Sequence, residues 1–281
     1  MKDLCHTTSM KQKSQMRSFS IATWNINSIR FRLPLILQFL QIKKPDILCL
    51  QETKCPNAYF PTNFLNNAGY KYITFSGQKS YNGVAILGKL PFSTISKPDL
   101  CDKNDCRYIT VTVNIGRKIH IHNFYIPAGG DEADPESNPQ FAYKLEFLQK
   151  MKNIFNQNSY SSILTGDLNI APLENDVWSH KKMLKTISHT LIETNSLKEI
   201  QIQGGWIDLI RNKIPEPKKI FTWWSYRSKN WKKSNRGRRI DHIWGSLDLV
   251  PYLNDIEIMQ ETRNWDKTSD HVPILANFTF T

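Results

Sequence analysis

The strongest constraint on the fold is a repeated pattern in which a short, apolar, strand-like run ends in polar residues. The pattern occurs at six places, and its polar residues are Asn25 and Asn27, Glu52, Tyr125, Asp167 and Asn169, Asp241, and Asp270 with His271. A single Asn or Asp at a strand end usually caps a turn. Because the pattern recurs, we expect rigid strands to bring these side chains together in one cleft.

The order of apolar and turn-forming residues predicts a mixed α/β chain. Strands are expected at 19–26, 47–50, 70–75, 83–87, 107–115, 119–125, 162–165, 220–224, 240–244, 256–260 and 272–280. Helices are expected near 29–40, at 140–155 and at about 181–199. Short turns join several consecutive strands, so at least part of the sheet structure should be antiparallel. The simplest architecture is a single domain over 19–281, with two sheets packed face to face and helices outside.

The N-terminal segment and the cysteines indicate where in the cell the protein is expected. Residues 1–18 are polar and basic and lack the apolar core of a secretory signal. We expect a disordered leader there, with Met16 a candidate for the true start. The five cysteines contain no C-x-x-C pair, which favours a reducing compartment and a cytoplasmic location. Organellar targeting by the basic N-terminus is the less favoured alternative. No apolar run reaches the ~18 residues that cross a bilayer, so no membrane span is expected.

The charge of the chain is strongly positive. It has 37 Lys and Arg against 25 Asp and Glu, a formal net charge of +12 and a pI near 9.4. A polyanionic partner is the favoured explanation, and simple solubility charge is the alternative. Between Pro217 and Arg239 there are nine basic residues, no acidic residue and five aromatic rings. Cations that meet phosphates and rings that stack on bases or sugars are typical of a nucleic-acid surface.

The polar residues at the strand ends indicate a reaction class. Glu52 and Asp270 are hard oxygen ligands suited to Mg²⁺ or Mn²⁺, and the absence of a His/Cys cluster argues against catalytic zinc. Neither a G-x-x-x-x-G-K-[ST] loop nor a G-x-S-x-G turn is present. Metal-assisted hydrolysis of a phosphate ester fits best, because Asp167 can take a proton from water while Asn and His side chains hold the phosphate oxygens.

Four motifs resemble one known family. PDILCLQETK (45–54), GDLN (166–169), NRGRRID (235–241) and SDH (269–271) are similar to the exonuclease III family of apurinic/apyrimidinic endonucleases, within the endonuclease/exonuclease/phosphatase superfamily. The likeness extends from about Ile21 to Phe280. GDLN and SDH are shared across the superfamily, whereas the other two motifs, with GQKSYNGVAIL (77–87) and FTWWSYRS (221–228), are more specific to the DNA-repair branch.

The resemblance implies a four-layered α/β sandwich, with two mixed, mainly antiparallel sheets face to face and helices outside. It also implies hydrolysis of the phosphodiester 5′ to an abasic site, together with 3′-to-5′ exonuclease and 3′-phosphatase or phosphodiesterase activity. The implied cofactor is Mg²⁺, for which Mn²⁺ substitutes. The implied partner is duplex DNA with abasic sites or blocked 3′ ends, bound by a monomer. The alternatives are a phosphoesterase for another phosphate ester and an inert nucleic-acid-binding relative.

The resemblance also assigns roles within the site. Glu52 is the main metal ligand, and Asp167 is the general base or acid. The positions grouped around the metal are Glu52, Asp270, Asn25, Asn27, Asp167 and Asn169. The positions grouped around the scissile phosphate are Asn25, Asn169, Tyr125 and His271, with Asp241 orienting the His271 ring. Adjacent residues of an extended segment point to opposite sides, so Asp270 and His271 should have separate partners.

A further set of residues is expected to contact DNA. By similarity, Trp223 and Trp224 line the pocket for the abasic sugar, while Arg30, Lys54 and Tyr81 approach the backbone or minor groove. Arg227, Lys229, Arg236 and Arg238 complete the expected DNA-binding set. Three positions depart from the family pattern: Ala128 replaces an amide, Arg238 stands where an apolar residue is common, and Trp244 replaces a small aliphatic residue. Asn27 stands where some relatives carry Asp.

Overall fold

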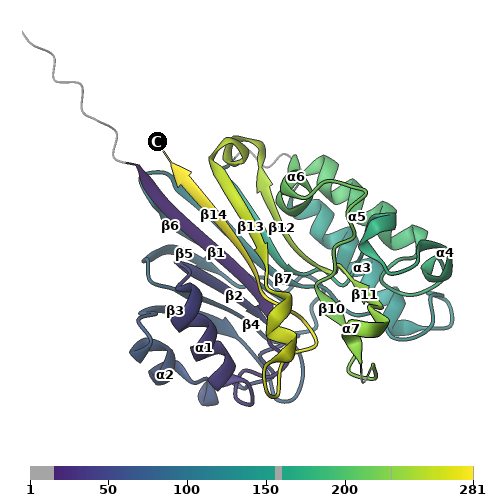
Figure 1. The fold of residues 1–281 in the computed structure, drawn as a ribbon, viewed down its shortest axis with the longest axis horizontal. Helices are drawn as coiled ribbons and strands as arrows, with labels where there is room; N and C mark the ends of the chain where they lie inside the picture. The colour runs from purple at the N-terminus through teal and green to yellow at the C-terminus, as the bar shows by residue number, and fades with distance from the viewer. Residues whose placement is uncertain (1–15, 156–159, 229, 281) are drawn as a thin grey trace, which may run out of the picture.

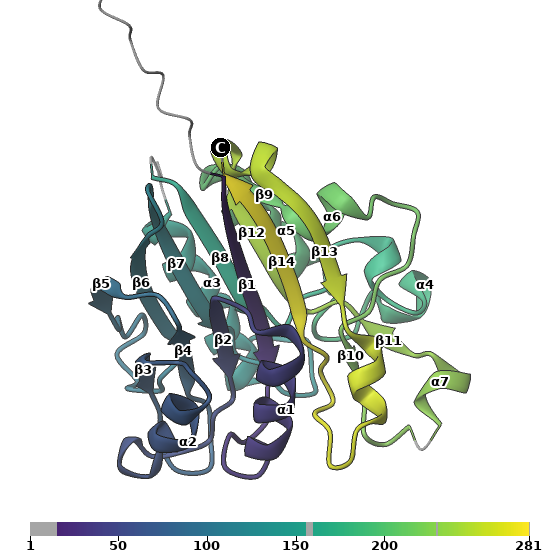
Figure 2. The same cartoon turned by 60° about the vertical axis from the view of Figure 1, so that its left-hand side comes forward.

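Two six-stranded sheets face each other, with helices on their outer faces (Figures 1 and 2). The computed structural model describes residues 16–155, 160–228 and 230–280. The core between the sheets is built from alternate residues of their strands. In the first strand, Phe19 and Ile21 face the opposite sheet, whereas Ala22 and Trp24 face the helices. The four-layered α/β sandwich predicted from the sequence is therefore confirmed.

The first sheet has the order β13-β14-β1-β2-β4-β3 and is antiparallel except between β1 and β2. Its strands are β1 (Arg17–Asn25), β2 (Ile47–Gln51), β3 (Tyr72–Ser76), β4 (Val84–Gly88), β13 (Leu253–Ile258) and β14 (Ile274–Phe280). Every residue of β2 is buried, as expected for an apolar run in the middle of a sheet. The parallel register pairs Asn25 with Gln51, so β1 and β2 end side by side.

The second sheet has the order β5-β6-β7-β8-β12-β9, and only β7 and β8 are parallel. Its strands are β5 (Phe92–Ser96), β6 (Tyr108–Asn114), β7 (Lys118–Tyr125), β8 (Ser162–Asp167), β9 (Trp206–Asp208) and β12 (Asp241–Ser246). The register places Tyr125 and Asp241 directly opposite Asp167, on its two neighbouring strands. Three of the predicted site residues are thus brought together by strand pairing alone.

The helices cover the two outer faces. Side chains of α1 (Leu33–Lys43) and α2 (Thr62–Asn67) pack on the first sheet, and those of α3 (Pro139–Ile154) and α5 (Leu191–Gln203) pack on the second. The shorter helical elements are α4 (His180–Met183), α6 (Leu209–Lys213), α7 (Trp231–Ser234), η1 (Asn57–Tyr59), η2 (Glu174–Asp176), η3 (Leu247–Tyr252) and η4 (Gln260–Asn264). Among the residues described, no helix combines the length and apolar character needed to cross a bilayer.

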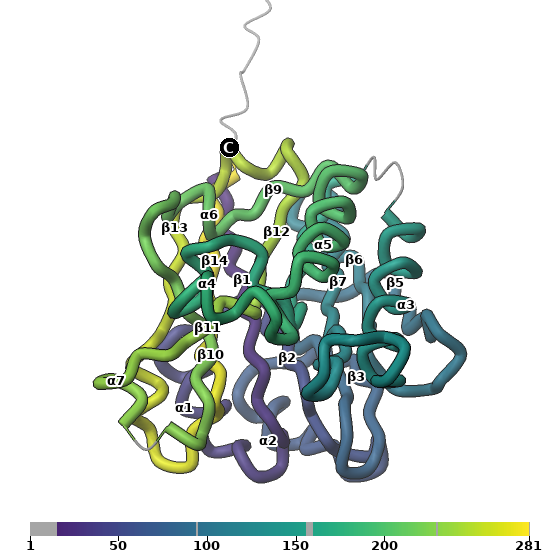
Figure 3. Tube along the Cα trace, turned by 90° about the vertical axis from the view of Figure 1, so that its right-hand side faces the viewer, coloured from purple at the N-terminus to yellow at the C-terminus, as the bar shows by residue number. Residues whose placement is uncertain are grey.

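A small two-stranded sheet lies at one corner of the molecule. It consists of β10 (Trp223–Trp224) and β11 (Gly237–Arg238), with α7 between them in the chain (Figure 3). Gly237 is required there, because a Cβ at this position would lie 2.6 Å from the Phe221 side chain. The bridge between Trp223 and His271 joins this corner to the segment that precedes β14.

Several predicted elements were wrong in extent. The helix expected at about 181–199 is two helices, because Thr190 begins α5 with a capping box to Glu193. The strands β5 and β9 were not predicted, and the strand expected at 220–224 is only the pair 223–224. The leader expected over 1–18 overlaps β1, which already includes Arg17 and Ser18. The remainder of that expected leader, 1–15, is outside the described residues.

Candidate active site

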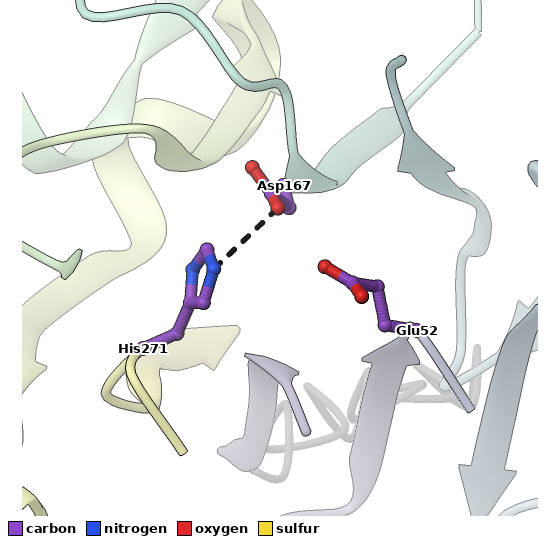
Figure 4. Close-up of side chains that lie close together, drawn as sticks. All are labelled: Glu52, Asp167 and His271. Carbon is purple, nitrogen blue, oxygen red and sulfur yellow. Dashed lines mark ion pairs between the residues drawn. The ribbon is translucent and has the colours of Figure 1, made fainter. Parts of the chain in front are cut away.

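The polar strand ends converge on one cavity of about 310 Å³. Of the predicted site residues, the cavity is lined by Glu52, Tyr125, Asp167, Asn169, Trp223, Arg238, Asp270 and His271. Glu52 follows β2, Asp167 ends β8 and His271 precedes β14, and their side chains face one another (Figure 4). The sheet geometry has therefore joined residues from distant parts of the chain.

Asn25 holds two carboxylates in place. Its side-chain amide donates to Glu52 Oε1 and to Asp167 Oδ2, each at 2.8 Å. Its own oxygen accepts the backbone N–H of Asn27 at 3.1 Å. Because the nitrogen, and not the oxygen, faces the carboxylates, Asn25 bridges the two acids and does not point an oxygen ligand toward them.

The turns that carry the acids have unusual backbones. Glu52, Asn27 and Asn169 adopt left-handed φ values of 50°, 46° and 51°. Asn tolerates this region, but Glu seldom adopts it, so local strain is present at Glu52. Gly166 before Asp167 has φ 136°, and a Cβ there would lie 1.9 Å from the Phe124 carbonyl oxygen. The Gly-Asp pair of the GDLN motif therefore reflects a close approach of β8 to β7.

His271 lies between two carboxylates. Its Nδ1–H donates to Asp241 Oδ2 at 2.9 Å, and its Nε2 lies 3.7 Å from Asp167 Oδ2. Asp241 is held in turn by the Thr222 hydroxyl, which donates to Asp241 Oδ2 at 2.6 Å. The predicted contact between His271 and Asp241 is present. Asp270 faces other groups, as the extended backbone requires.

The acids and the histidine perturb each other's titration. Burial opposes the charged His271 ring, but the carboxylates of Asp241 and Asp167 outweigh it and raise the His271 pKa to about 10. Burial raises the pKa of Asp167 well above its ordinary value, and Asp241 and Glu52 add to this effect against the opposing His271 charge. Burial also raises the Tyr125 pKa, so this phenol keeps its proton. Near neutral pH the cavity thus offers a proton acceptor beside a fixed cation and an O–H donor.

The cluster fits a hard cation. Glu52, Asp167 and His271 each present a potential ligand atom, all within 4.8 Å of one another. The raised pKa keeps the His271 ring charged near neutral pH, so the carboxylates are the ligands a metal would find there. Lys54 Nζ lies 2.7 Å from Glu52 Oε2 and 2.7 Å from Asn27 Oδ1. A side-chain ammonium therefore already meets the carboxylate that is expected to bind a cation.

Asp270 has partners of its own within the cavity. Its Oδ1 accepts from Asn27 Nδ2 at 3.2 Å, and its Oδ2 accepts from Trp223 Nε1 at 2.9 Å. Burial disfavours the charged carboxylate, but the His271 charge and these hydrogen bonds lower the Asp270 pKa. Asp270 is outside the group of three whose ligand atoms approach within 4.8 Å. It therefore lies beside the candidate metal centre and anchors the Trp223 ring.

This chain matches the model of the endonuclease/exonuclease/phosphatase family over residues 22–271. It belongs to that family. Exodeoxyribonuclease III of Haemophilus influenzae is 29% identical to it, over 91% of this chain and 98% of that protein. The structure of an AP endonuclease from Archaeoglobus fulgidus is similar, with a TM-score of 0.85 and 31% identity over 92% and 99% of the two chains. A 3′ phosphatase from Neisseria, bound to product DNA hairpin, has the same TM-score and identity over 93% and 100%.

Within this family member, the residues expected to contact DNA have different environments. Arg30, Tyr81, Arg227 and Arg236 are exposed. Trp223 and Arg238 line the cavity. Lys54 points at Glu52 instead of outward, and Lys229 is outside the described residues.

Trp224, which was expected to line the pocket for the abasic sugar, is almost fully buried. Its side chain is buried in a cluster with Phe221 and Val272, and its ring N–H donates to Asn235 Oδ1 at 3.1 Å. The basic surface is also smaller than its sequence indicated, because Arg239 is fully buried and ion-paired with Asp176 and Asp208. The structure also locates two of the positions that depart from the family pattern. Trp244 is buried in the core, and Ala128 lines the cavity.

Two supporting residues were not found from the sequence. Thr222 holds Asp241 and also accepts the backbone N–H groups of Ile240 and Asp241 at 3.1 Å. Lys144 is buried, donates to the Asn169 carbonyl at 2.8 Å and lies 2.5 Å from Glu193. The position of Thr222 within FTWWSYRS was a usable signal. Lys144 gave none, because a lysine within a helix is ordinarily exposed.

Proposed function

We propose that this chain is a metal-dependent DNA-repair nuclease that hydrolyses the phosphodiester 5′ to an abasic site in duplex DNA and also removes blocking groups from 3′ ends. Its class is that of a hydrolytic nuclease of DNA repair with 3′-end processing, as its family and relatives indicate. The finer assignment to abasic sites, to Mg²⁺ with Mn²⁺ as a substitute, and to a monomer belongs to the proposal. A cytoplasmic location is proposed with it.

One observation carries this function. A buried carboxylate with a raised pKa, Asp167, lies between a second carboxylate, Glu52, and a charged ring, His271. This arrangement combines a proton acceptor near its working pH, a site for a cation and a donor for phosphate oxygens. No second function has a comparable observation behind it.

The side chains divide the reaction between them. Asp167 takes the proton from the attacking water, because its raised pKa makes it a competent base near neutrality. His271 is held charged by Asp241 and stabilises the negative charge that develops on the phosphate. Tyr125 retains its O–H and donates to a phosphate oxygen. A cation held by Glu52 and Asp167 would neutralise phosphate charge and acidify water.

The exposed cations near the cavity support a DNA substrate. Arg227 and Arg236 lie on the β10-α7-β11 corner, and Arg30 follows β1. Phosphate contacts release counterions, so affinity for duplex DNA should fall steeply with rising salt. A salt dependence close to flat would count against this surface.

The decisive experiment compares a duplex that contains one abasic-site analogue with an undamaged duplex of the same sequence, in Mg²⁺ with and without EDTA. We expect incision 5′ to the analogue, leaving a 3′-hydroxyl, and loss of incision in EDTA. An inositol phosphate is tested in parallel. Turnover of that substrate without incision would favour another phosphoesterase, and tight DNA binding without cutting in either Mg²⁺ or Mn²⁺ would favour an inert binding protein.

A further inference from the structure

The cavity beside the catalytic carboxylates contains a cation that has no ion-pair partner as far as the structure describes the chain. Arg238 lines this cavity together with Trp223, Ile240 and His271. Within the described part of the chain, its polar contacts are to neutral groups, and no carboxylate forms an ion pair with it. The neighbouring Arg239, by contrast, is paired with two carboxylates. The two adjacent arginines therefore have different electrostatic states.

Arg238 is held firmly against the cavity wall. Its Nη1 donates to the Ile187 carbonyl at 3.1 Å and to Ser188 Oγ at 2.9 Å. Its guanidinium carbon lies 5.1 Å from the centre of the Trp223 ring. Trp223 and Arg238 are also directly opposite each other in the β10–β11 pair. Strand pairing, ring contact and two hydrogen bonds thus fix the direction of this side chain.

The remaining nitrogens of Arg238 are available to a ligand. Both hydrogen bonds use Nη1, and neither Nε nor Nη2 has a protein partner among the described residues. Burial lowers the Arg238 pKa, and the more distant Glu193 charge opposes this effect without cancelling it. A desolvated guanidinium of this kind gains most from an anionic oxygen, which it can meet with two parallel N–H groups.

We propose that Arg238 makes this cavity selective for DNA 3′ ends whose blocking group carries a negative charge, over internal abasic sites. The proposal rests on the proposed function. An internal abasic site presents an uncharged deoxyribose beside the scissile phosphate. In a 3′-phosphate, the phosphate oxygen that would be esterified to this sugar is free and carries a second negative charge, and a 3′-phosphoglycolate presents a carboxylate in place of the sugar.

The reaction is the same hydrolysis for each blocked end. Water oxygen forms a bond to phosphorus, and the bond between phosphorus and the 3′ oxygen breaks. Asp167 receives the water proton, the 3′ oxygen takes a proton from a solvent water as it leaves, and Asp167 then returns its proton to solvent. The products are a 3′-hydroxyl end and either inorganic phosphate or phosphoglycolate. Arg238 contributes by binding the anionic group and takes no part in proton transfer.

The test uses three duplexes of one sequence, with an internal abasic-site analogue, a 3′-phosphate or a 3′-phosphoglycolate. kcat and KM are measured for the wild type, Arg238→Leu, Arg238→Gln and Arg238→Lys. Lys150→Leu, at an exposed position on α3, controls for the loss of one positive charge. Removing a charge-assisted contact should lower kcat/KM for both anionic ends by ~10-fold or more, mainly through KM. Cutting at the abasic analogue should change by less than ~3-fold, and Arg238→Lys should fall between.

The outcomes separate this inference from the function on which it rests. Equal losses on all three duplexes, or no change in their ratio, would overturn the role of Arg238 while leaving the nuclease intact. A wild type that cuts none of the duplexes overturns both the function and the inference. Should Arg238→Leu fail to fold, Arg238→Gln and Arg238→Lys carry the same comparison, because a purely structural role would not change the substrate ratio.

Discussion

Two groups of buried charges at the same end of the second sheet behave in opposite ways. Asp176 and Asp167 are both fully buried. Asp176 accepts two hydrogen bonds from Arg239, at 2.7 Å each, and another from Arg211. These cations overcome the effect of burial and lower the Asp176 pKa. The Asp167 carboxylate accepts from the Asn25 amide at 2.8 Å and from the Asn169 backbone N–H at 2.9 Å, while the His271 ring nitrogen lies 3.7 Å away, and the Asp167 pKa is raised.

The opposite pKa shifts of Asp176 and Asp167 reflect how completely the charges of each group are paired. In the group of Asp176, Asp208, Arg211 and Arg239, the opposite charges are paired with one another, and removing one partner would leave a buried charge uncompensated. In the group of Glu52, Asp167 and His271, the carboxylates have oxygen atoms that remain for a metal cation, and the charged His271 ring can meet a phosphate oxygen. Charge that the protein leaves uncompensated is typical of functional sites, which supports the role proposed for this group.

The largest expected effect comes from removing a carboxylate from the catalytic group. Glu52→Ala should lower metal-dependent incision by ~10³-fold or more, because the cation loses its principal ligand. The thermal midpoint should change little, since Glu52 is not part of the Arg239 contacts. Incision kinetics and calorimetry measure the two effects. Glu257→Ala, which removes a carboxylate paired with Lys43 on the first sheet, is the control. Normal cutting by Glu52→Ala at ordinary Mg²⁺ would show that the ligand assignment is wrong.

The second prediction removes the cation from the fully paired group around Asp176. Arg239→Met should lower the free energy of unfolding by about 3–5 kcal/mol, because Asp176 and Asp208 lose a buried partner. Folded molecules should keep most of their kcat. Urea denaturation gives the stability, and kinetics at a temperature where the variant is folded give the activity. Arg117→Met removes a partly exposed pair with Asp248 and should cost no more than about 1 kcal/mol. Similar losses for the two variants would contradict this account.

The smallest expected effect is on the pH dependence of stability, to which His242 and His271 contribute with opposite signs. Burial and the nearby Arg239 charge lower the His242 pKa to about 4. The unfolded chain therefore binds more protons than the folded chain as pH falls below 6.5, and stability is lost toward pH 4. This contribution is roughly 2 kcal/mol between pH 7.5 and 5. His271 has the opposite sign, because its raised pKa contributes stability below 6.5 that is lost as pH rises toward 10.

Denaturation curves at several pH values check this prediction. His242→Gln should show a shallower loss of stability on the acid side than the wild type, whatever its stability at neutral pH. Glutamine is chosen because its amide can still donate to the Ile170 carbonyl, which His242 Nε2 meets at 2.8 Å. An unchanged acid-side slope would show that His242 is not responsible.

The sequence alone determined the chemistry of the strand ends and the class of fold. Alternating apolar residues, turn residues and motifs such as GDLN are local signals, so they predicted most strands, the sandwich and the residues that share a cavity. The pairing of His271 with Asp241 was implied by the family resemblance, and the alternation of extended neighbours added that Asp270 should have a different partner.

Only the tertiary structure decided what surrounds each of these residues. Trp224 and Arg239 are buried, Lys54 forms an ion pair with Glu52, and Asp270 accepts a hydrogen bond from Trp223. Arg238 lines the cavity and forms no ion pair with a carboxylate of the described residues. In the sequence, Arg238 and Arg239 are adjacent and of one type. Their environments depend on strand register and on carboxylates brought from distant segments, and such contacts form only when the sheets pack.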